Sequence, residues 1–157
     1  MRRKDREITG INEKLALIQE CKVCRLGLSE NNFPYLIPLN YGYTYRDDTL
    51  TLFFHSAKEG RKIEIIRNNN NACFEIDCGT KLIEGDKPCD YGCSYKSIIG
   101  FGKIIFLETD GEKSEGLNHI MKHQTGKETG YHYAKADLDN VCVYKMIVEE
   151  FTGKQKG

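Results

Sequence analysis

The chain has 157 residues, which is enough for one domain with a sizeable core. It carries 23 basic and 23 acidic residues, and this formal charge of zero argues against nucleic-acid binding through a general basic field. The charged opening Met1–Glu7 leads into no signal-peptide core, and the longest apolar-rich run, Ser97–Leu107, is well short of the ~20 residues that span a bilayer. We therefore expect one domain over 1–157, cytoplasmic, with no membrane or nucleic-acid partner.

The first third of the chain predicts a helix followed by strands. The expected elements are a helix over Ile11–Cys21, and strands over Val23–Leu28, Tyr35–Tyr43 and Thr49–His55. Pro38 removes a ladder donor, so its strand must lie at a sheet edge or be bulged there. The turn at Arg46–Asp48 predicts that the last two strands form a hairpin.

The segment Thr51–Lys62 changes from a strand pattern to a helix pattern after His55. Ser56 and Glu59 stand three apart, which is the spacing of a capping box. This spacing predicts a helix that begins after Ser56 and runs to about Arg67.

Two cations, Arg61 and Lys62, fall in the first turns of this expected helix. The free amides of a helix start and its positive dipole end would point the same way as these cations, which suggests an anion seat. Our hypothesis is that the seat holds the phosphate of a flavin nucleotide. The simpler alternative is an ordinary strand-to-helix junction with solvated cations.

The rest of the chain predicts long strands around a second helix. We expect strands over Ala72–Cys78, Ser94–Leu107 and Val141–Phe151, a helix from Asp110 or Gly111 to Gly126, and loops over Gly79–Gly92 and Tyr131–Tyr133. Gly100 and Gly102 predict a bend or a close backbone approach within the longest strand. About seven strands at hairpin-like spacing, with three helices, predict a mainly β fold: a small antiparallel barrel with helices outside.

Seven cysteines are a high and odd count for this length. Cys21 and Cys24 form one Cys-x-x-Cys pair, but no second tight pair follows to complete a zinc site. His119 and His123 stand four apart on what we expect to be an exposed helix face, without the glutamate of a His-Glu-x-x-His motif. We therefore predict reduced, mostly buried thiols and no metal site.

The chain has no Rossmann fingerprint, phosphate loop or nucleophile elbow. A flavin site instead needs cations and amides for the phosphate, backbone groups along the ring edge and apolar walls for the ring faces. The strand Leu36–Gly42 could supply the edge groups, because Pro38 leaves ladder partners unpaired. Ser56 could add a hydroxyl donor.

Several short motifs then carry a resemblance that spans nearly the whole chain. They are Met1–Ile8, Pro34–Tyr43, Phe54–Lys62, Cys73–Glu75, Tyr95–Gly102, Met121–Gly126 and Thr152–Lys154. Together they resemble the pyridoxamine 5′-phosphate oxidase-like flavoproteins, most closely the 5-nitroimidazole-resistance (Nim-type) branch. The resemblance implies a split β-barrel of about six to seven antiparallel strands with flanking helices.

The resemblance also implies a homodimer that binds FMN at the subunit interface; whether the nucleotide is FMN or the larger FAD stays open. Pro38, Leu39, Asn40 and Tyr41 would line the flavin ring, His55 and Ser56 would sit near the cofactor, Arg61 and Lys62 would hold the phosphate, and Tyr95, Ser97 and Ile98 would form a second wall or donate hydrogen bonds. His55 would lie beside the substrate, where a neutral imidazole can donate a proton during reduction. The alternative for His55 is a strand-end histidine that only bonds backbone.

Two departures from the family pattern are small. Ser56 stands where glycine is frequent, and Ile98 where valine is common. The chain also lacks the additional cations that true pyridoxamine phosphate oxidases use for their substrate, which argues against vitamin B6 oxidation.

The expected function is therefore an FMN-dependent oxidoreductase that reduces a small acceptor, with nitroaromatics as candidates. Two alternatives stay open: a flavin carrier or sensor without turnover, and a haem-binding split barrel with an axial histidine. The sequence does not distinguish NADH from NADPH as the electron donor.

Overall fold

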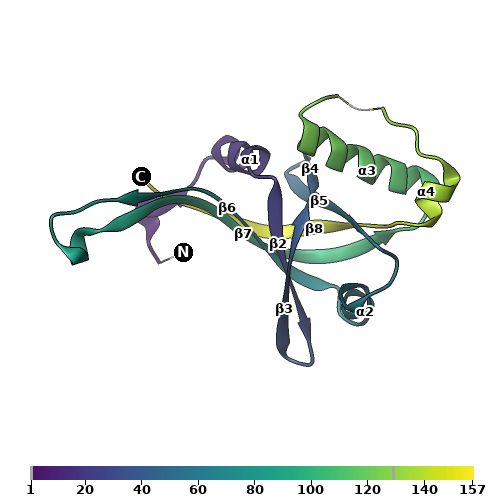
Figure 1. Ribbon diagram of the computed structural model, residues 1–157, viewed down its shortest axis with the longest axis horizontal. Coiled ribbons are helices and arrows are strands. Elements are labelled where there is room, and N and C mark those ends of the chain that lie inside the picture. Colours follow the sequence, from purple (N-terminus) through teal and green to yellow (C-terminus); the bar gives the residue numbers. More distant parts are fainter. Residues whose placement is uncertain (1, 129) are drawn as a thin grey trace.

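A computed structural model describes residues 2–128 and 130–157. In chain order, its elements are η1 (Lys4–Arg6), β1 (Glu7–Ile8), α1 (Ile11–Glu20), β2 (Val23–Glu30), β3 (Phe33–Asn40), β4 (Gly42–Arg46), β5 (Thr49–Ser56), α2 (Arg61–Asn68), β6 (Asn71–Ile83), η2 (Pro88–Asp90), β7 (Gly92–Leu107), α3 (Asp110–Thr125), α4 (Lys135–Asp139) and β8 (Cys142–Lys156). The strands form one sheet in the order β3-β2-β6-β7-β8-β5-β4, and β1 also pairs with β8. Neighbouring strands are antiparallel, and the sheet is curved but not closed, so the mainly β split-barrel class is confirmed (Figure 1).

The expected strand Tyr35–Tyr43 is divided in two. β3 pairs with β2 at one edge of the sheet, whereas β4 pairs with β5 at the other edge. The predicted hairpin therefore forms from β4 and β5 alone, with Asp47 and Asp48 at positive φ in its turn. Pro38 lies in the edge strand β3, as its missing donor requires, and pairs with Arg25 without a register shift.

The long strand β7 bends beside β8 at its glycines. The register shifts between Phe101 and Gly102, and a Cβ atom on Gly102 would lie 2.0 Å from the carbonyl oxygen of Ile147. No side chain fits at that distance, so the predicted close backbone approach is confirmed.

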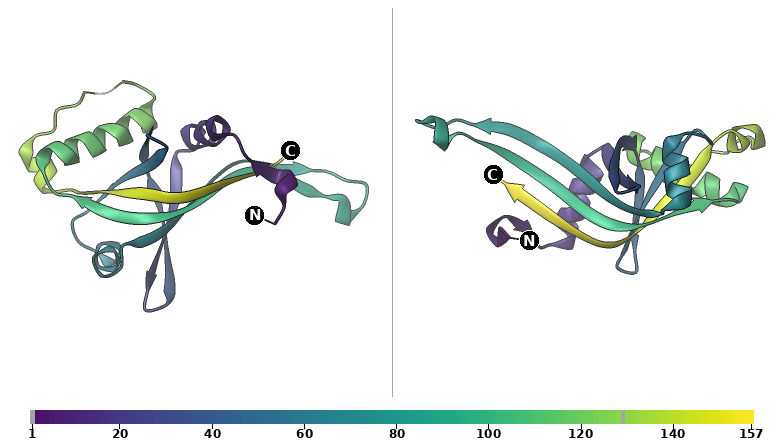
Figure 2. Two further views of the ribbon diagram at one scale, coloured as in Figure 1. Left: turned by 180° about the vertical axis from the view of Figure 1, so that it is seen from behind. Right: turned by 90° about the horizontal axis from the view of Figure 1, so that it is seen from below.

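The β6–β7 hairpin is longer than expected. The segment Gly79–Gly92, predicted as a loop, is partly paired, because β6 continues to Ile83 and β7 begins at Gly92. The register shifts between Cys78 and Lys81, where Gly79 has φ 71°. The paired strands project from the body of the molecule as an arm (Figures 1 and 2).

Two apolar clusters hold the body together. The larger one fills the curled sheet and includes the fully buried rings of Tyr41, Phe54, Phe74 and Tyr144. The smaller one joins α3 to the outer face of β5, β7 and β8 through Phe53, Leu107, Ile120 and Val143.

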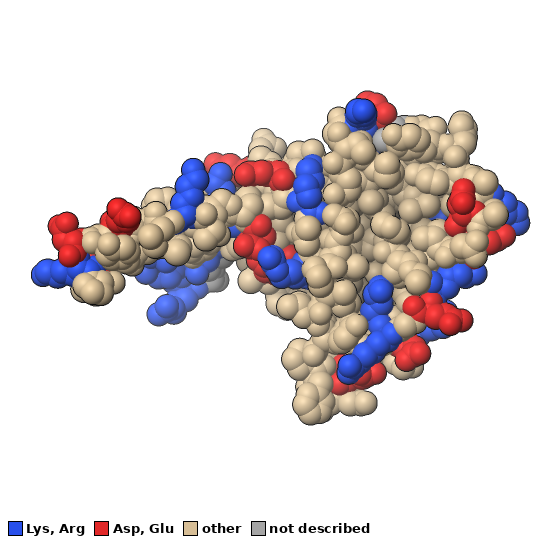
Figure 3. Space-filling view, viewed as in Figure 1, with Lys and Arg blue, Asp and Glu red and all other residues tan. Residues whose placement is uncertain are grey.

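The helix α3 agrees with its predicted bounds. Thr109 and Glu112 form a capping box at its start, and Gly126 ends it with φ 71°. The short helix α4 was not predicted. No helix among the described residues is both long enough and apolar enough to cross a membrane. Basic and acidic side chains are interspersed on the face shown in Figure 3, in keeping with the zero net charge.

Candidate functional site

The end of β5 places His55 and Ser56 on opposite faces of the sheet. Strand side chains alternate, so Ser56 shares the core face with Phe54, whereas His55 shares the outer face with Phe53. His55 is exposed, yet partial desolvation lowers its pKa from the ordinary value. A single ligand could reach both side chains only around the strand end.

The helix α2 begins later than the sequence predicts. Ser56 is still in the β5 ladder, opposite Cys142, and its hydroxyl donates to the carbonyl oxygen of Ala57 at 2.9 Å. The predicted capping box of Ser56 and Glu59 is therefore wrong. Gly60 occupies the N-cap position instead, with φ 124° and ψ 165°, a conformation that favours glycine.

Among the residues that the structure describes, no side chain caps the start of α2. The carbonyl of Gly60 accepts from the amides of Ile63 and Glu64, at 2.9 and 3.3 Å. The amides of the first two helical residues, Arg61 and Lys62, precede the first intrahelical bonds and face outward from the helix end. An uncapped helix start of this kind can accept an anion.

The two cations of this helix start are held differently. Arg61 donates from Nε and Nη2 to one oxygen of Glu30, at 3.1 and 2.9 Å, and its guanidinium lies 5.0 Å from the ring centroid of Tyr35. Lys62 is half-buried, and no carboxylate within residues 2–128 and 130–157 pairs with it. Lys62 is thus the more available of the two charges.

The segment predicted to line the flavin ring contains Tyr41 and Asn40, whose side chains bond to backbone carbonyls. Tyr41 is fully buried, and its hydroxyl donates to the carbonyl oxygens of Ile18 at 2.7 Å and Cys21 at 3.1 Å. Asn40 donates to the carbonyl oxygen of Lys22 at 3.1 Å. These two side chains tie the strand to α1 and β2.

Pro38 and Leu39 lie on the edge strand β3. Pro38 is exposed and Leu39 is half-buried against the core. Because β3 has no neighbour on its outer side, its backbone is open to a ligand there.

The remaining predicted residues lie far from the β5–α2 junction. Tyr95 pairs with Lys156, Ser97 with Lys154, and Ile98 with Gly153 in the β7–β8 ladder. By contrast, His55 pairs with Val143 near the opposite end of β8. The stretch of β8 between these two places spans about 36 Å at about 3.3 Å per residue. One chain therefore does not bring the two sets of predicted residues together.

The distant set has its own small cavity. Ser97 and Lys154, with Ile99 and Thr152, line a hollow of about 230 Å³. Lys154 lies 5.8 Å from the ring centroid of Tyr95, and its hydrogen bonding lowers the pKa of that phenol. Ile98 is fully buried in the core and supports this wall from behind.

The two histidines of α3 are not on an exposed face, as the sequence had predicted. His123 is 2% exposed; its Nδ1 lies 2.8 Å from the carbonyl oxygen of Tyr41, and its Nε2 lies 3.3 Å from that of Gln19. His119 stacks on Phe53 with ring centroids 4.6 Å apart. Both rings are turned toward the sheet, His123 to the carbonyl of Tyr41 after the end of β3 and His119 to the ring of Phe53.

The cysteines remain thiols in the part of the chain that the structure describes. Burial raises the pKa of Cys21 to about 12, so this thiol is protonated and unreactive at neutral pH. Across the described residues, no group of three or more His, Cys, Asp or Glu side chains is arranged to hold a metal ion.

Comparison with known proteins gives a family and several similar structures. The sequence profile described as pyridoxamine 5′-phosphate oxidase matches residues 12–155. A search of curated proteins finds no match. A Bacteroides thetaiotaomicron protein assigned to 5-nitroimidazole antibiotic resistance is 33% identical, with a TM-score of 0.81 over 95% of this chain and 86% of that one.

Two more distant structures share the fold. An FAD- and haem-binding protein from Mycobacterium smegmatis is 13% identical, with a TM-score of 0.83 over 96% of this chain and 73% of that one. An FAD-binding protein from Mesorhizobium loti is 23% identical, with a TM-score of 0.65 over 97% and 98%. The family profile, which covers most of the chain, shows that this protein belongs to the pyridoxamine 5′-phosphate oxidase family.

Proposed function

We propose that this protein is an FMN-dependent oxidoreductase that acts as a homodimer and reduces a small acceptor. The observation that carries the proposal is the β5–α2 junction. An uncapped helix start, a half-buried Lys62 without an ion pair in the described chain, and the Ser56 hydroxyl all belong to this short segment of the chain. A phosphate group matches all three, because it accepts hydrogen bonds and carries negative charge.

Arg61 can join this seat at little cost. Its present partner, Glu30, forms a surface pair in which the side chains of Arg61 and Glu30 are 61% and 34% exposed. Such pairs contribute only about 0.2–1 kcal/mol, whereas a charge-assisted bond to phosphate contributes about 1.5–3 kcal/mol. The guanidinium therefore gains by turning from the carboxylate to a phosphate.

His55 would serve the acceptor side of the site. A bound flavin supplies the two-electron chemistry, and the protein supplies binding, orientation and proton transfer. Because desolvation lowers the pKa of His55, its ring is neutral at pH 7 and, once protonated, gives up its proton readily. The exposed position of the ring leaves it open to a small molecule.

The wall formed by Tyr95, Ser97 and Ile98 would come from a second copy of the chain. In a symmetric dimer, each copy can present its β7 wall to the β5–α2 junction of the other. Mixing Lys62→Ala protein with Ser97→Tyr protein would test this arrangement. About a quarter of the sites should regain flavin binding after random exchange, because half of the dimers would be mixed and each would hold one intact site. No recovery would mean that one chain builds its own site.

The function itself can be tested by spectroscopy and turnover. Purified protein should take up FMN and show the absorbance of an oxidised flavin; a protein that binds neither FMN nor FAD would contradict the proposal. Titration with both nucleotides separates FMN from FAD, and a Soret band would instead indicate haem.

Turnover separates an enzyme from a carrier. Anaerobic reduction by NADH or NADPH should be followed by reoxidation with a small acceptor. Nitroimidazoles are the first acceptors to test, because a 33% identical relative is assigned to resistance against them. His55→Ala should slow reoxidation by about 100-fold while flavin affinity changes little, and His132→Ala is the matched control. Flavin that no donor reduces would favour the carrier.

A further inference from the structure

A second, smaller cavity lies where β7 ends, β8 begins, and α2 and α3 approach them. Its volume is about 120 Å³, and its charged lining is Lys58, Arg67, Lys113 and Glu108, with Cys142 in its wall. A cavity needs about 10–15 Å³ of such volume to hold one water molecule, so this cavity has room for a small polyatomic ion.

Three cations in this lining face one carboxylate. Lys58 and Arg67 form no ion pair within residues 2–128 and 130–157. Lys113 donates from Nζ to the carbonyl oxygen of Leu138, at 3.2 Å, and forms no ion pair with a described carboxylate. The cavity therefore has an excess of positive charge that the described protein does not neutralise.

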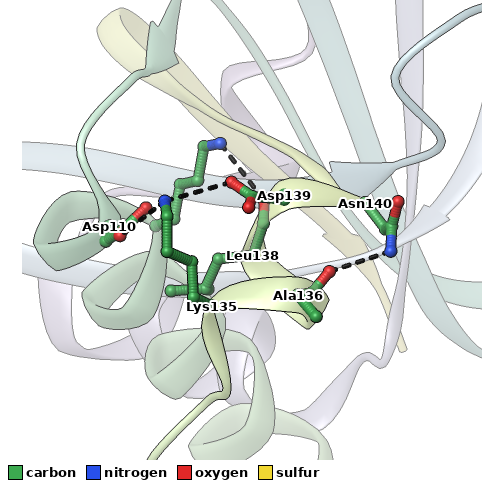
Figure 4. A network of polar contacts seen from close by, with 7 residues as sticks. Asp110, Lys135, Ala136, Leu138, Asp139 and Asn140 are labelled. Carbon is green, nitrogen blue, oxygen red and sulfur yellow. Dashed lines mark hydrogen bonds and ion pairs between the residues drawn. The ribbon is translucent and has the colours of Figure 1, made fainter.

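The acidic groups nearest on α3 and α4 are already engaged. Lys135 lies between Asp110 and Asp139, with its Nζ 3.3 Å from a carboxylate oxygen of each (Figure 4). Both carboxylates are thus paired with Lys135, and neither forms an ion pair with Lys113 within residues 2–128 and 130–157.

The thiol of Cys142 lines the same cavity as the three cations, and their charges act on its pKa. Burial raises the pKa of Cys142, and Arg67, Lys113 and Lys58 oppose that rise, with Arg67 first among them. Glu108 acts in the opposite sense. An anion placed against this wall would meet the same three cations.

We propose that this cavity is a binding site for a phosphoryl group, held by Arg67, Lys58 and Lys113. Arginine presents a planar fork that matches phosphate oxygens, and the two lysines add point charges. The site is separate from the junction at Arg61, since the two arginines lie about 9 Å apart along the axis of α2. It does not depend on flavin binding.

Isothermal titration of the full-length protein with inorganic phosphate at low ionic strength tests the site. Saturable binding is expected, and both Arg67→Ala and Lys113→Ala should weaken it by about tenfold. Glu108→Gln, which removes the competing carboxylate, should tighten binding by a few fold. Lys127→Ala, at the far end of α3, is the matched control and should leave binding unchanged.

Three results would overturn the proposal. The first is the absence of saturable phosphate binding. The second is equal weakening by Lys127→Ala, and the third is loss of phosphate binding in Arg61→Ala/Lys62→Ala protein, because in either case the phosphate would occupy another place. Since flavin uptake is measured separately, failure here leaves the proposed flavin function standing, and the reverse also holds.

The source of the phosphoryl group is resolved by a second titration. If Arg67→Ala weakens NADPH binding by about tenfold and leaves NADH binding unchanged, the group is the 2′-phosphate of the nicotinamide nucleotide. If phosphate binds and Arg67→Ala changes the affinities for NADPH and NADH equally, the site holds a free oxyanion. Both results support the site and assign its ligand.

Discussion

The two ends of the β7–β8 ribbon are built in different ways. At one end, α3 packs against β7 and β8, α2 packs against β2, and Arg67 and Lys113 line a cavity beside the ribbon. At the other end, the ribbon runs into the projecting arm, where Leu82 is 63% and Tyr91 49% exposed (Figures 1 and 2). A two-stranded hairpin alone is marginally stable in water, so the projecting arm is the less supported of the two ends.

This difference fits the proposed homodimer, in which each chain would supply half of the flavin site. The packed end would supply the phosphate seat through the start of α2. The extended end would supply the second wall through Tyr95 and Ser97, which lie far from α2 in the same chain. The bend at Gly102 lies between the two ends and sets their relative direction.

Gly102→Val should have the largest effect, because it removes that bend. The new side chain would meet the carbonyl oxygen of Ile147, so β7 and β8 would have to separate. We expect a loss of at least about 3 kcal/mol in the free energy of unfolding, or failure to fold. Urea unfolding measures it, with Gly111→Ala as control, since a Cβ atom on Gly111 meets nothing within 4 Å. An unchanged midpoint for Gly102→Val would show that the two ends are not fixed by this approach.

Arg61→Ala/Lys62→Ala should affect cofactor binding without affecting the fold. Both residues are at the surface of α2, and together they supply the charge of the phosphate seat. The expected weakening of FMN binding is about 10- to 100-fold, because each charge-assisted contact contributes about 1.5–3 kcal/mol and solvent screening reduces the sum. Fluorescence titration of FMN measures it, with Lys127→Ala as control. Equal affinity in the double variant would place the phosphate elsewhere.

A pH effect on stability should arise at the packed end. Burial lowers the pKa of His123 below its ordinary value near 6.5, so the folded protein binds fewer protons than the unfolded chain in acid. Stability is therefore fully present above about pH 6.5 and is lost as the pH falls toward the lowered pKa. Urea unfolding between pH 8 and pH 5 should show this loss, and His123→Gln should flatten the slope relative to His132→Gln. Parallel slopes in the two variants would assign the pH dependence to other groups.

The sequence predicted most helices and strands, but not the pairing between strands that decides where an element ends and the next begins. Ser56–Glu59 and Thr109–Glu112 are both Ser/Thr-x-x-Glu patterns near the end of a strand, and only the second caps a helix. Thr109 follows the last ladder residue of β7 and is free to cap. Ser56 is still paired with Cys142, so α2 cannot begin until Gly60. The spacing of neighbouring residues does not reveal that pairing, because Cys142 is far from Ser56 in the sequence.

The same reason explains the errors at Tyr41 and His123. A continuous apolar run predicted one strand through Tyr41, but its hydroxyl is drawn to carbonyls near the end of α1, and the chain there passes from one sheet edge to the other. The carbonyl oxygen of Tyr41 lies within hydrogen-bond distance of His123, which the sequence had predicted to lie on an exposed helix face. The position of Pro38 at an edge was predictable, because the missing amide is a property of that residue alone.

Tyr144→Phe should have the smallest effect and the opposite sign. The Tyr144 ring is fully buried between Phe54 and Phe106, and its hydroxyl has no hydrogen-bond partner among the described residues. Ser56 is near enough to oppose the burial that raises the pKa of this phenol, but the two hydroxyls do not meet hydrogen-bond geometry. An unpaired buried hydroxyl costs about 1–3 kcal/mol, but its removal also loses the packing of one atom. The net result should be a rise of up to about 1 kcal/mol in the free energy of unfolding.

Urea unfolding of the flavin-free protein measures the effect of Tyr144→Phe, and Tyr41→Phe is the matched control. The Tyr41 hydroxyl is also fully buried but donates to two carbonyls, so its removal leaves acceptors unpaired and should destabilise the fold by about 1–3 kcal/mol. The two variants delete the same atom from the same core, and only the presence of partners differs. A loss of stability in Tyr144→Phe as large as in Tyr41→Phe would mean that the Tyr144 hydroxyl is already paired, most directly with Ser56 at the packed end of the ribbon.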